Sequence, residues 1–253
     1  MTPYKYALAG LVMLATGGSP WQLEAVRLRY NLPTSVSLGE PVVVTMTVEN
    51  ASSKPTAVDL GWNRVGAFMF QVLEPGGTRR QFKPTIEEGI AKNSIVRVQP
   101  NDSFEQWVVL DEWFEFRRAG NYSVSISIDT TTARRLGASL SVPGEGPQVV
   151  RVEPRNDVRL RRRCQELLSL IVPRSPRFLE ALKVLTHVSD PVAVPYLRQV
   201  LAADPAFGSQ IVAGLERIKN PEAIAVLEKL STGSDAEVRA AAKAALVRIG
   251  RRQ

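Results

Sequence analysis

We predict a multidomain protein of the β plus α class, in which an antiparallel β-sandwich is followed by a short α-solenoid of three helix pairs. Two patterns predict it. Between residues 23 and 153, apolar residues alternate with polar ones in short runs that end at turn residues, which is typical of half-buried antiparallel strands. From residue 189 to 251, one helical pattern occurs twice at an interval of 30 residues, marked by Asp190-Pro191 and Asn220-Pro221. A repeat of this length indicates stacked helix pairs.

The first 18 residues have the composition of a secretory signal peptide. Lys5 precedes a run of 12 apolar and small residues, 7–18, and Ala15-Thr16-Gly17 has the small residues that a signal peptidase requires. We therefore predict a signal peptide over residues 1–18 and an exported protein, periplasmic or extracellular. An uncleaved anchor and a buried first element are the alternatives, although a helix needs roughly 20 residues to span the hydrocarbon core. No other segment could cross a membrane, so no transmembrane segment is expected in the mature chain.

A β-sandwich is expected over residues 23–154, where eight short runs read as strands. They are residues 25–30, 41–48, 67–73, 94–98, 104–110, 120–128, 138–142 and 148–152. The run at 41–48 is the strongest, because it is rich in β-branched residues and ends at a polar turn. No convincing helix separates the runs, and parallel strands would need crossover helices. The sandwich is therefore expected to be antiparallel.

Two motifs in this segment carry a family likeness. Ser37-Leu38-Gly39-Glu40-Pro41 leads into the strongest strand, which has Asn50 at its end. Phe114-Glu115-Phe116 is followed by Ala119-Gly120-Asn121-Tyr122-Ser123-Val124. In these residues the segment resembles the immunoglobulin-like (Ig-like) domains of bacterial envelope and secreted proteins. The resemblance implies an Ig-like β-sandwich with Tyr122 packed at its corner, and such domains serve as spacers or as adhesion and binding modules.

A helical domain is expected over residues 155–253, because alternation gives way to helical periodicity at Glu153-Pro154-Arg155-Asn156. Asn156 or Asp157 can cap the first helix, whose apolar stripe begins at Leu160 and includes Cys164. Six helices follow, at about 157–171, 177–187, 191–202, 206–218, 221–231 and 236–249. They form three antiparallel pairs.

The last helix carries the second family likeness. Asp235 to Gly250 reads as an acidic cap, a Val-Arg pair, paired alanines, a leucine and a closing Ile-Gly. In these residues the chain resembles HEAT-like repeats of the PBS-lyase type, over at most its last 97 residues. The resemblance implies a stack of helix pairs that binds a protein partner, with Arg239 as the arginine that bridges neighbouring pairs. Small side chains let helices approach closely, so a large residue at Ala241 or Ala245 should be costly.

The net charge of +7 lies wholly in the helical part. Residues 1–154 carry 15 basic and 15 acidic side chains, whereas residues 155–253 carry 17 basic and 10 acidic ones. The densest basic patch could contact an anionic membrane surface, nucleic acid or an acidic partner, and export disfavours nucleic acid. It could equally be a solvated helix face that pairs with Glu166 and with the edge of the sandwich. This basic patch is Arg159, Arg161, Arg162 and Arg163.

The sequence offers little for catalysis or metal binding, so we expect neither an enzyme nor a cofactor. His187 is the only histidine and Cys164 the only cysteine, which excludes a His/Cys zinc cluster. His187 aligns with Arg217 of the next repeat, a position expected to face solvent, and Cys164 is expected to be buried as a small hydrophobe. No serine stands in a Gly-x-Ser-x-Gly motif, and no phosphate-binding Gly-rich loop follows a strand. The carboxylates that could be paired for catalysis are expected on the solvated surface: Glu87, Glu88, Asp111, Glu112 and Glu115.

The densest aromatic cluster is Trp107, Trp113, Phe114 and Phe116. Aromatic side chains can stack on sugars or anchor a peptide, but in a sandwich they more often form the core. Trp113 or Phe114 is the one expected at the surface, because acidic and basic pairs flank them.

The leading functional hypothesis is a protein-protein interaction or scaffold protein that binds through the second helices of its pairs. These helices are expected to present Arg177, Glu180, Lys183, Gln210, Arg217, Arg239 and Lys243. The alternative is a carbohydrate-binding or protease-binding module in the sandwich, which uses Trp113 and Phe114, with the solenoid as a spacer. A third class is an enzyme with an unrecognised site, by analogy with lyases that carry similar repeats.

Overall fold

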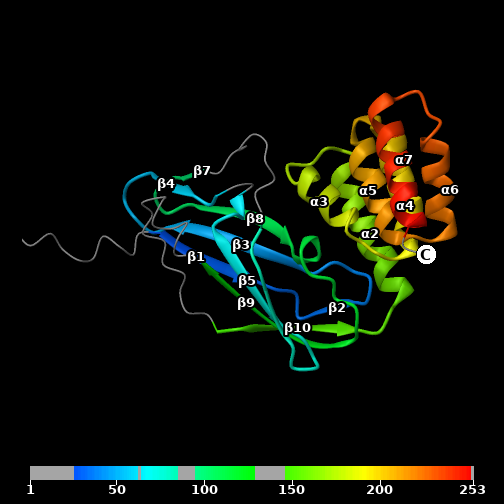
Figure 1. The fold of residues 1–253 in the computed structure, drawn as a ribbon. Coiled ribbons are helices and arrows are strands. Elements are labelled where there is room, and N and C mark those ends of the chain that lie inside the picture. Colours follow the sequence, from blue (N-terminus) through cyan, green and yellow to red (C-terminus); the bar gives the residue numbers. More distant parts are fainter. Residues whose placement is uncertain (1–25, 62–63, 85–94, 129–145, 252–253) are drawn as a thin grey trace, which may run out of the picture.

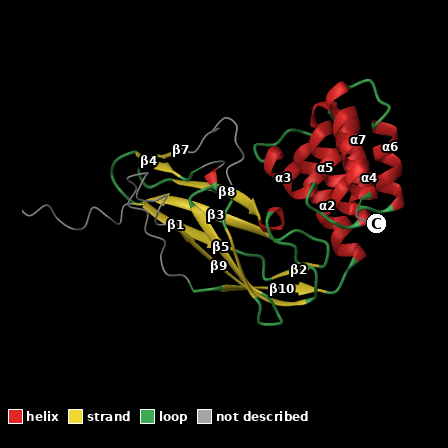
Figure 2. Cartoon of the chain, in the orientation of Figure 1, coloured by secondary structure: helices red, strands yellow, loops and turns green. Residues whose placement is uncertain are grey.

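The computed structural model describes residues 26–61, 64–84, 95–128 and 146–251 (Figure 1). A β part is followed directly by a helical part, and the two lie side by side (Figure 2). The predicted signal peptide at 1–18, the predicted strand at 138–142, and Glu87 and Glu88 lie outside the described residues.

The described strands of the β part form three sheets. A three-stranded antiparallel sheet has the order β1 (Val26–Asn31), β3 (Val43–Asn50), β8 (Ser103–Val109). A five-stranded sheet has the order β2 (Ser35–Ser37), β10 (Gln148–Glu153), β9 (Gly120–Ile128), β5 (Phe68–Leu73), β6 (Arg79–Phe82). The third sheet pairs β4 (Thr56–Asp59) with β7 (Ile95–Val98).

Alternation along the strands builds one apolar core between the sheets. In β3, Val44, Met46 and Val48 are buried, whereas the residues between them are half-buried. The same core contains Phe70 of β5 and Val150 of β10, which belong to the five-stranded sheet. Each predicted strand that falls among the described residues is present. β2, β4 and β6 were not predicted, because they have only three or four residues and β6 reads Arg-Arg-Gln-Phe, which has no alternation.

The prediction of a wholly antiparallel arrangement is wrong at one edge of the five-stranded sheet. β2 pairs with β10 in parallel, with Ser35 opposite Arg151 and Ser37 opposite Glu153. No crossover helix is needed, because the two strands stand at opposite ends of the β part and the strands between them make the connection. This edge also places the β2–β3 turn beside the start of the helices.

The expected corner tyrosine is present. Tyr122 is buried, and its hydroxyl donates a hydrogen bond to the Arg118 carbonyl at 3.0 Å. Its ring contacts Phe116 edge to face, with ring centroids 5.0 Å apart. The turn before β9 is thereby held against the core of the β part.

The helical part has six helices, close to the predicted ranges. They are α2 (Asp157–Ile171), α3 (Phe178–Leu185), α4 (Val194–Ala203), α5 (Gly208–Ile218), α6 (Pro221–Leu230) and α7 (Ala236–Gly250). α4 and α5 each follow a 3₁₀ turn, η4 (Pro191–Ala193) and η5 (Pro205–Phe207). Side-chain caps begin five of these segments: Asn156, Asp190, Asp204, Asn220 and Asp235 each accept a backbone N–H from the first turn.

Small residues set how closely the helices pack. α5 packs against both α6 and α7. A Cβ atom added to Gly208 of α5 would lie 2.3 Å from Cγ2 of Val238 on α7, so the helices cross where no side chain fits. Ala242 and Ala245 on α7 are fully buried, whereas Ala241 is only half-buried. Among the described residues, no helix is long and apolar enough to cross a membrane.

Ala245→Phe is expected to lower the free energy of unfolding by about 1–3 kcal/mol, because the added ring has no room among the packed helices. The measurement is urea denaturation followed by circular dichroism. Ala244→Phe is the matched control, since Ala244 is exposed one residue earlier on the same helix. Equal stability of the two variants would remove Ala245 from the core.

Candidate functional site

The first turn of α2 is bonded to the β2–β3 turn, and this contact begins the junction between the two parts. The backbone N–H of Asn156 donates to Ser37 Oγ at 2.8 Å. Arg159 donates from Nε to Glu40 Oε2 at 2.7 Å and from Nη1 to Ser35 Oγ at 3.0 Å, and it also reaches the Ser35 carbonyl. Glu153 lies 3.4 Å from the same guanidinium. Arg159 is thus a structural residue of the junction.

Asp190 makes a second contact. Its carboxylate is buried, pairs with Arg155 at 2.5 Å, and accepts the Val192 N–H that begins η4. Gly39 packs against it: a Cβ there would lie 3.0 Å from the Asp190 Cβ, and its φ of +90° favours glycine. The Ser189 N–H donates to the Gly39 carbonyl at 3.1 Å. The Asp-Pro motif that marks the repeat therefore also binds the β part.

α3 faces the outer side of β8. Arg177 Nη2 lies 2.6 Å from Glu105 Oε1, and Lys183 Nζ lies 2.6 Å from Glu112 Oε2. Glu180 accepts the Trp107 backbone N–H at 2.9 Å. These side chains were predicted to face a partner protein, whereas in this structure they contact the chain's own β part. Arg177 and Lys183 each keep 38% of the side chain exposed.

The remaining predicted interface residues lie on α5 and α7. Arg217 on α5 donates to the Thr186 carbonyl at 3.1 Å. Although Arg217 keeps exposed surface, burial of its guanidinium lowers its pKa. Arg239 donates to the carbonyls of Gly233 and Ser234 in the loop before its own helix, so it does not make the expected bridge between neighbouring pairs. Lys243 and Gln210 are exposed.

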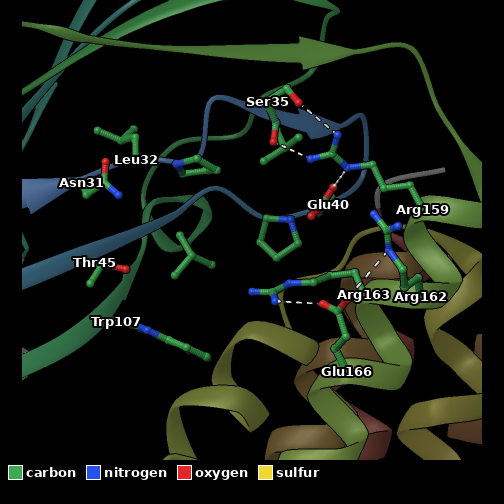
Figure 3. A pocket seen from close by; sticks show the side chains of 14 residues that line it. Asn31, Leu32, Ser35, Glu40, Thr45, Trp107, Arg159, Arg162, Arg163 and Glu166 are labelled. Carbon is green, nitrogen blue, oxygen red and sulfur yellow. Dashed lines mark hydrogen bonds and ion pairs between the residues drawn. The ribbon is translucent and has the colours of Figure 1, made fainter.

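A groove of about 340 Å³ lies between the β1–β2 loop, β3 and α2 (Figure 3). Three arginines of the predicted basic patch line it. Arg159 is turned toward Glu40 and Ser35, whereas Arg162 and Arg163 share Glu166 at 3.8 and 3.4 Å. Trp107 of β8 forms the opposite wall, 6.0 Å from the Arg163 guanidinium. We call this the arginine groove. Arg161 does not line it and is exposed.

A second cavity, of about 610 Å³, lies on the same junction, and we call it the junction cavity. The β part contributes Asp111, Glu115 and Phe116, and the helical part contributes His187, Arg217 and Lys219 among others. Asp111 accepts the Val42 N–H at 2.7 Å. Although the residue is only half-buried, desolvation of its carboxyl raises the pKa to about 8. The prediction of a solvated Asp111 is therefore wrong, whereas Glu112 and Glu115 are exposed and ion-paired.

The prediction that His187 faces solvent is wrong, because the side chain is buried. α3 ends at Leu185, and His187 lies in the following turn with 7% of its surface exposed. Gly214 brings α5 close to this turn, because a Cβ there would lie 3.2 Å from the Thr186 Cα. Burial, followed by the positive charges of Arg217 and Lys183, lowers the His187 pKa to about 4. The ring is therefore neutral at pH 7.

The tautomer of His187 follows from its contact. Nδ1 lies 2.7 Å from the Lys183 carbonyl, which can only accept, so Nδ1 carries the proton. Nε2 then presents a lone pair, and no described residue donates a hydrogen bond to it. A buried acceptor without a donor is uncommon in folded proteins.

The other chemistry-bearing residues are in the cores. Cys164 is buried as predicted, and burial raises its thiol pKa to about 12. Phe114 and Phe116 are buried, so Phe114 is not the surface aromatic that was expected. Trp113 is half-buried and stacks on Phe70, with ring centroids 5.6 Å apart. In the part of the chain that the structure describes, no cluster of three or more His, Cys, Asp and Glu side chains could hold a metal ion.

Sequence reasoning missed the carboxylates that complete the junction. Glu40 and Asp190 are each joined to an arginine more than 30 positions away in the chain. The only local signals were the Gly39 turn and the Asp-Pro cap. Neither indicates which arginine would lie opposite.

Arg159→Gln is expected to lower the free energy of unfolding by about 1–3 kcal/mol, because it leaves the nearly buried Glu40 carboxylate without its cation. Urea denaturation measures the loss. Arg161→Gln on the same helix should change stability by less than about 0.5 kcal/mol. Matching losses in both variants would contradict the role given to Arg159.

The free energy of unfolding is expected to fall by about 1 kcal/mol as pH rises from about 6.5 to 8. Asp111 has a folded pKa raised to about 8, so its contribution is present below its unfolded pKa and is lost as pH rises through 8. Arg217 and Glu115 face this carboxyl and act in opposite directions. His187, with its lowered pKa, loses its contribution only as pH falls from 6.5 through 4.

Asp111→Asn isolates this effect, because the amide oxygen can still accept the Val42 N–H. Its urea midpoint should be the same at pH 6.5 and pH 8, whereas that of the wild type should decrease. A wild-type midpoint that does not change between these pH values would show that Asp111 titrates as it does in water.

Comparison with known protein families gives a match within the helical part. The model of HEAT repeats matches residues 178–247. No curated protein matches the chain.

Similar solved structures include a CARDB domain from Pyrococcus furiosus in complex with di-metal ions, an Ig-like domain that matches the N-terminal β region (13% identity, TM-score 0.25, 51% of this chain and 86% of that one). They also include the alkylpurine DNA glycosylase of Pseudomonas fluorescens bound to DNA with an abasic site analog (11% identity, TM-score 0.27, 52% of this chain and 31% of that one). A third is a β-glucosidase from Listeria innocua (14% identity, TM-score 0.28, 52% of this chain and 16% of that one). The chain thus spans less than a third of the glycosylase and about a sixth of the β-glucosidase. Residues 178–247 are similar to HEAT repeats, as the residues of the last helix predicted.

Proposed function

We propose that this chain is an exported, non-enzymatic protein-protein interaction or scaffold protein. An Ig-like β-sandwich and a HEAT solenoid of three helix pairs act in it as one unit. HEAT repeats generally mediate protein interactions, and the match at residues 178–247 supports this class of function. The ion pairs and the shared apolar contacts of the junction support the idea of one unit. Export rests on the signal-peptide pattern of residues 1–18.

The arginine groove is the surface that fits a partner best, and this is the observation that carries the proposal. Arg177, Lys183 and Arg159 are held by carboxylates of the chain itself. Arg162, by contrast, has 74% of its side chain exposed, and it shares one glutamate with Arg163.

Two arginines on one carboxylate leave a positive charge at the mouth of the groove. The half-buried Trp107 ring in the opposite wall has the Arg177 guanidinium 5.1 Å from its centroid, and the part of the ring that lines the groove offers an apolar contact of the kind that anchors peptides. We propose that the groove binds an acidic segment of a partner protein. A membrane surface fits it less well, because Arg159 and Arg163 are turned inward between the two parts of the chain.

The two residues proposed for carbohydrate binding, Trp113 and Phe114, are not free on the surface. Phe114 is buried, and Trp113 stacks on the core of the β part beneath Lys183. Charge reversal at Lys183 or Arg217 would disturb the junction itself. The variants that test the proposal are therefore made in the arginine groove.

The test is affinity capture with the immobilised chain from an extract of the native cell envelope, followed by quantitative mass spectrometry. Arg162→Glu combined with Arg163→Glu should reduce retention of the bound acidic partner about ten-fold or more, since two favourable charge contacts become repulsive. Arg161→Glu combined with Arg198→Glu is the charge-matched control, with both residues exposed and outside the groove. Equal retention by the two double variants, or by wild type at high and low salt, would exclude the groove as the interface.

A further inference from the structure

The junction cavity carries an inference that is independent of the arginine groove. Its volume of about 610 Å³ lies within the range of pockets that hold small ligands. It lies where two domains meet, which is a frequent place for such pockets. The polar groups that line it decide what it can hold.

The charges in the cavity do not cancel within the described residues. Glu40, Glu115, Asp190 and Glu216 each have an arginine partner, two of which, Arg117 and Arg155, also line the cavity. Arg217 and Lys219 line it without an ion pair. The remaining carboxyl is Asp111, whose raised pKa keeps it mostly protonated at pH 7. The cavity therefore holds two cations that form no ion pair with a described carboxylate, although the charges of Glu112 and Glu216 act on Arg217 from a greater distance.

His187 supplies the second polar requirement. Its Nε2 is an acceptor without a donor among the described residues, and its ring lines the cavity. Arg217 is close to it, because Nη1 of Arg217 bonds the carbonyl of the preceding residue, Thr186, at 3.1 Å. Nε2 is enclosed in this structure, so a bond from a ligand to it requires a local movement of the side chains around the ring.

We propose that the junction cavity binds the free carboxylate of a ligand that also carries a neighbouring N–H or O–H group. The carboxylate pairs with Arg217 and Lys219, and the N–H or O–H donates to His187 Nε2. The planar guanidinium matches the two oxygens of a carboxylate. A phosphate dianion fits less well, because Glu115 and Glu216 also line the cavity. The carboxyl end of a peptide and a free hydroxy acid share this chemistry.

The lone histidine makes the site directly observable. In the full chain labelled with ¹⁵N-histidine, every ring signal belongs to His187. At pH 7 the spectrum should show Nδ1 protonated and Nε2 unprotonated. Added N-acetylglycine, which represents the end of a peptide, or lactate, which represents a free hydroxy acid, should move the Nε2 signal upfield until the site is saturated. The ligand that saturates the site at the lower concentration identifies the source: the end of a peptide if it is N-acetylglycine, and a free hydroxy acid if it is lactate.

Three probes test the assignment on the wild-type chain alone. Acetate lacks the donor and should bind with a smaller shift of Nε2, whereas N-acetylglycinamide lacks the carboxylate and should cause no saturable shift. Phosphate should bind more weakly than either carboxylate ligand. If neither N-acetylglycine nor lactate gives a saturable shift, or if N-acetylglycinamide or phosphate gives an equal one, the proposal is overturned.

Two variants locate the contacts by calorimetry. Arg217→Gln should raise the Kd for N-acetylglycine about ten-fold or more, while Arg198→Gln, an exposed arginine on α4, should leave it unchanged. His187→Asn keeps an N–H for the Lys183 carbonyl but lacks Nε2, so it should lose the preference for N-acetylglycine over acetate. An unchanged Kd in Arg217→Gln would also overturn the proposal.

Discussion

The contact of Arg159 with the β2–β3 turn determines how the rest of the molecule is arranged. Its guanidinium bonds Glu40 and Ser35, 119 and 124 residues earlier in the chain, from the first turn of the first helix. α3 and α4 pack on α2, α5 packs on α4, and α6 and α7 pack on α5, so the direction of α2 against the sheets places the later helices. A buried arginine-carboxylate pair adds little net stability compared with an apolar pair, but its geometry is directional. Here it determines an orientation that apolar packing alone would leave less defined.

The surplus of basic side chains in the helical part is partly used inside the molecule. The β part is neutral overall, yet carboxylates such as Glu105 and Glu112 lie on the side that faces the helices. Cations of α2 and α3 pair with them across the junction. Val109, on the outer side of the sheet, is buried in the helical core, so apolar contact accompanies the charges. The electrostatic surface offered to a partner is therefore smaller than composition indicates.

Most of the fold could be predicted from the sequence, because periodicity and capping are local properties. The six helices lie close to their predicted ranges, and each has an apolar face that its spacing describes. The parallel pairing of β2 with β10 was missed, because it joins three residues near one end of the β part to a strand at the other. Its register depends on contacts that no short window contains.

The candidate site could be predicted much less well, for the same reason. Arg177 and Lys183 were predicted as cations of a second helix, but the carboxylates that pair with them lie in the β part. His187 was placed in solvent because its repeat equivalent is an arginine. The structure instead buries it, since Gly214 allows α5 to come close to the turn at Thr186. Burial by a neighbouring helix depends on a glycine that the histidine's own surroundings do not reveal.

The exposed position of Lys243 has a consequence for how far the stack can extend in this direction. Gly214 and Ala245 are equivalent positions in successive repeats, and by the same offset Lys243 occupies the place of Val212. Val212 is buried in the helical core. Another helix pair stacked on α7 in the same way would have to remove the Lys243 ammonium from water without a partner, which is strongly unfavourable. The exposed Lys243 ammonium therefore keeps this part of the outer side of α7 hydrated.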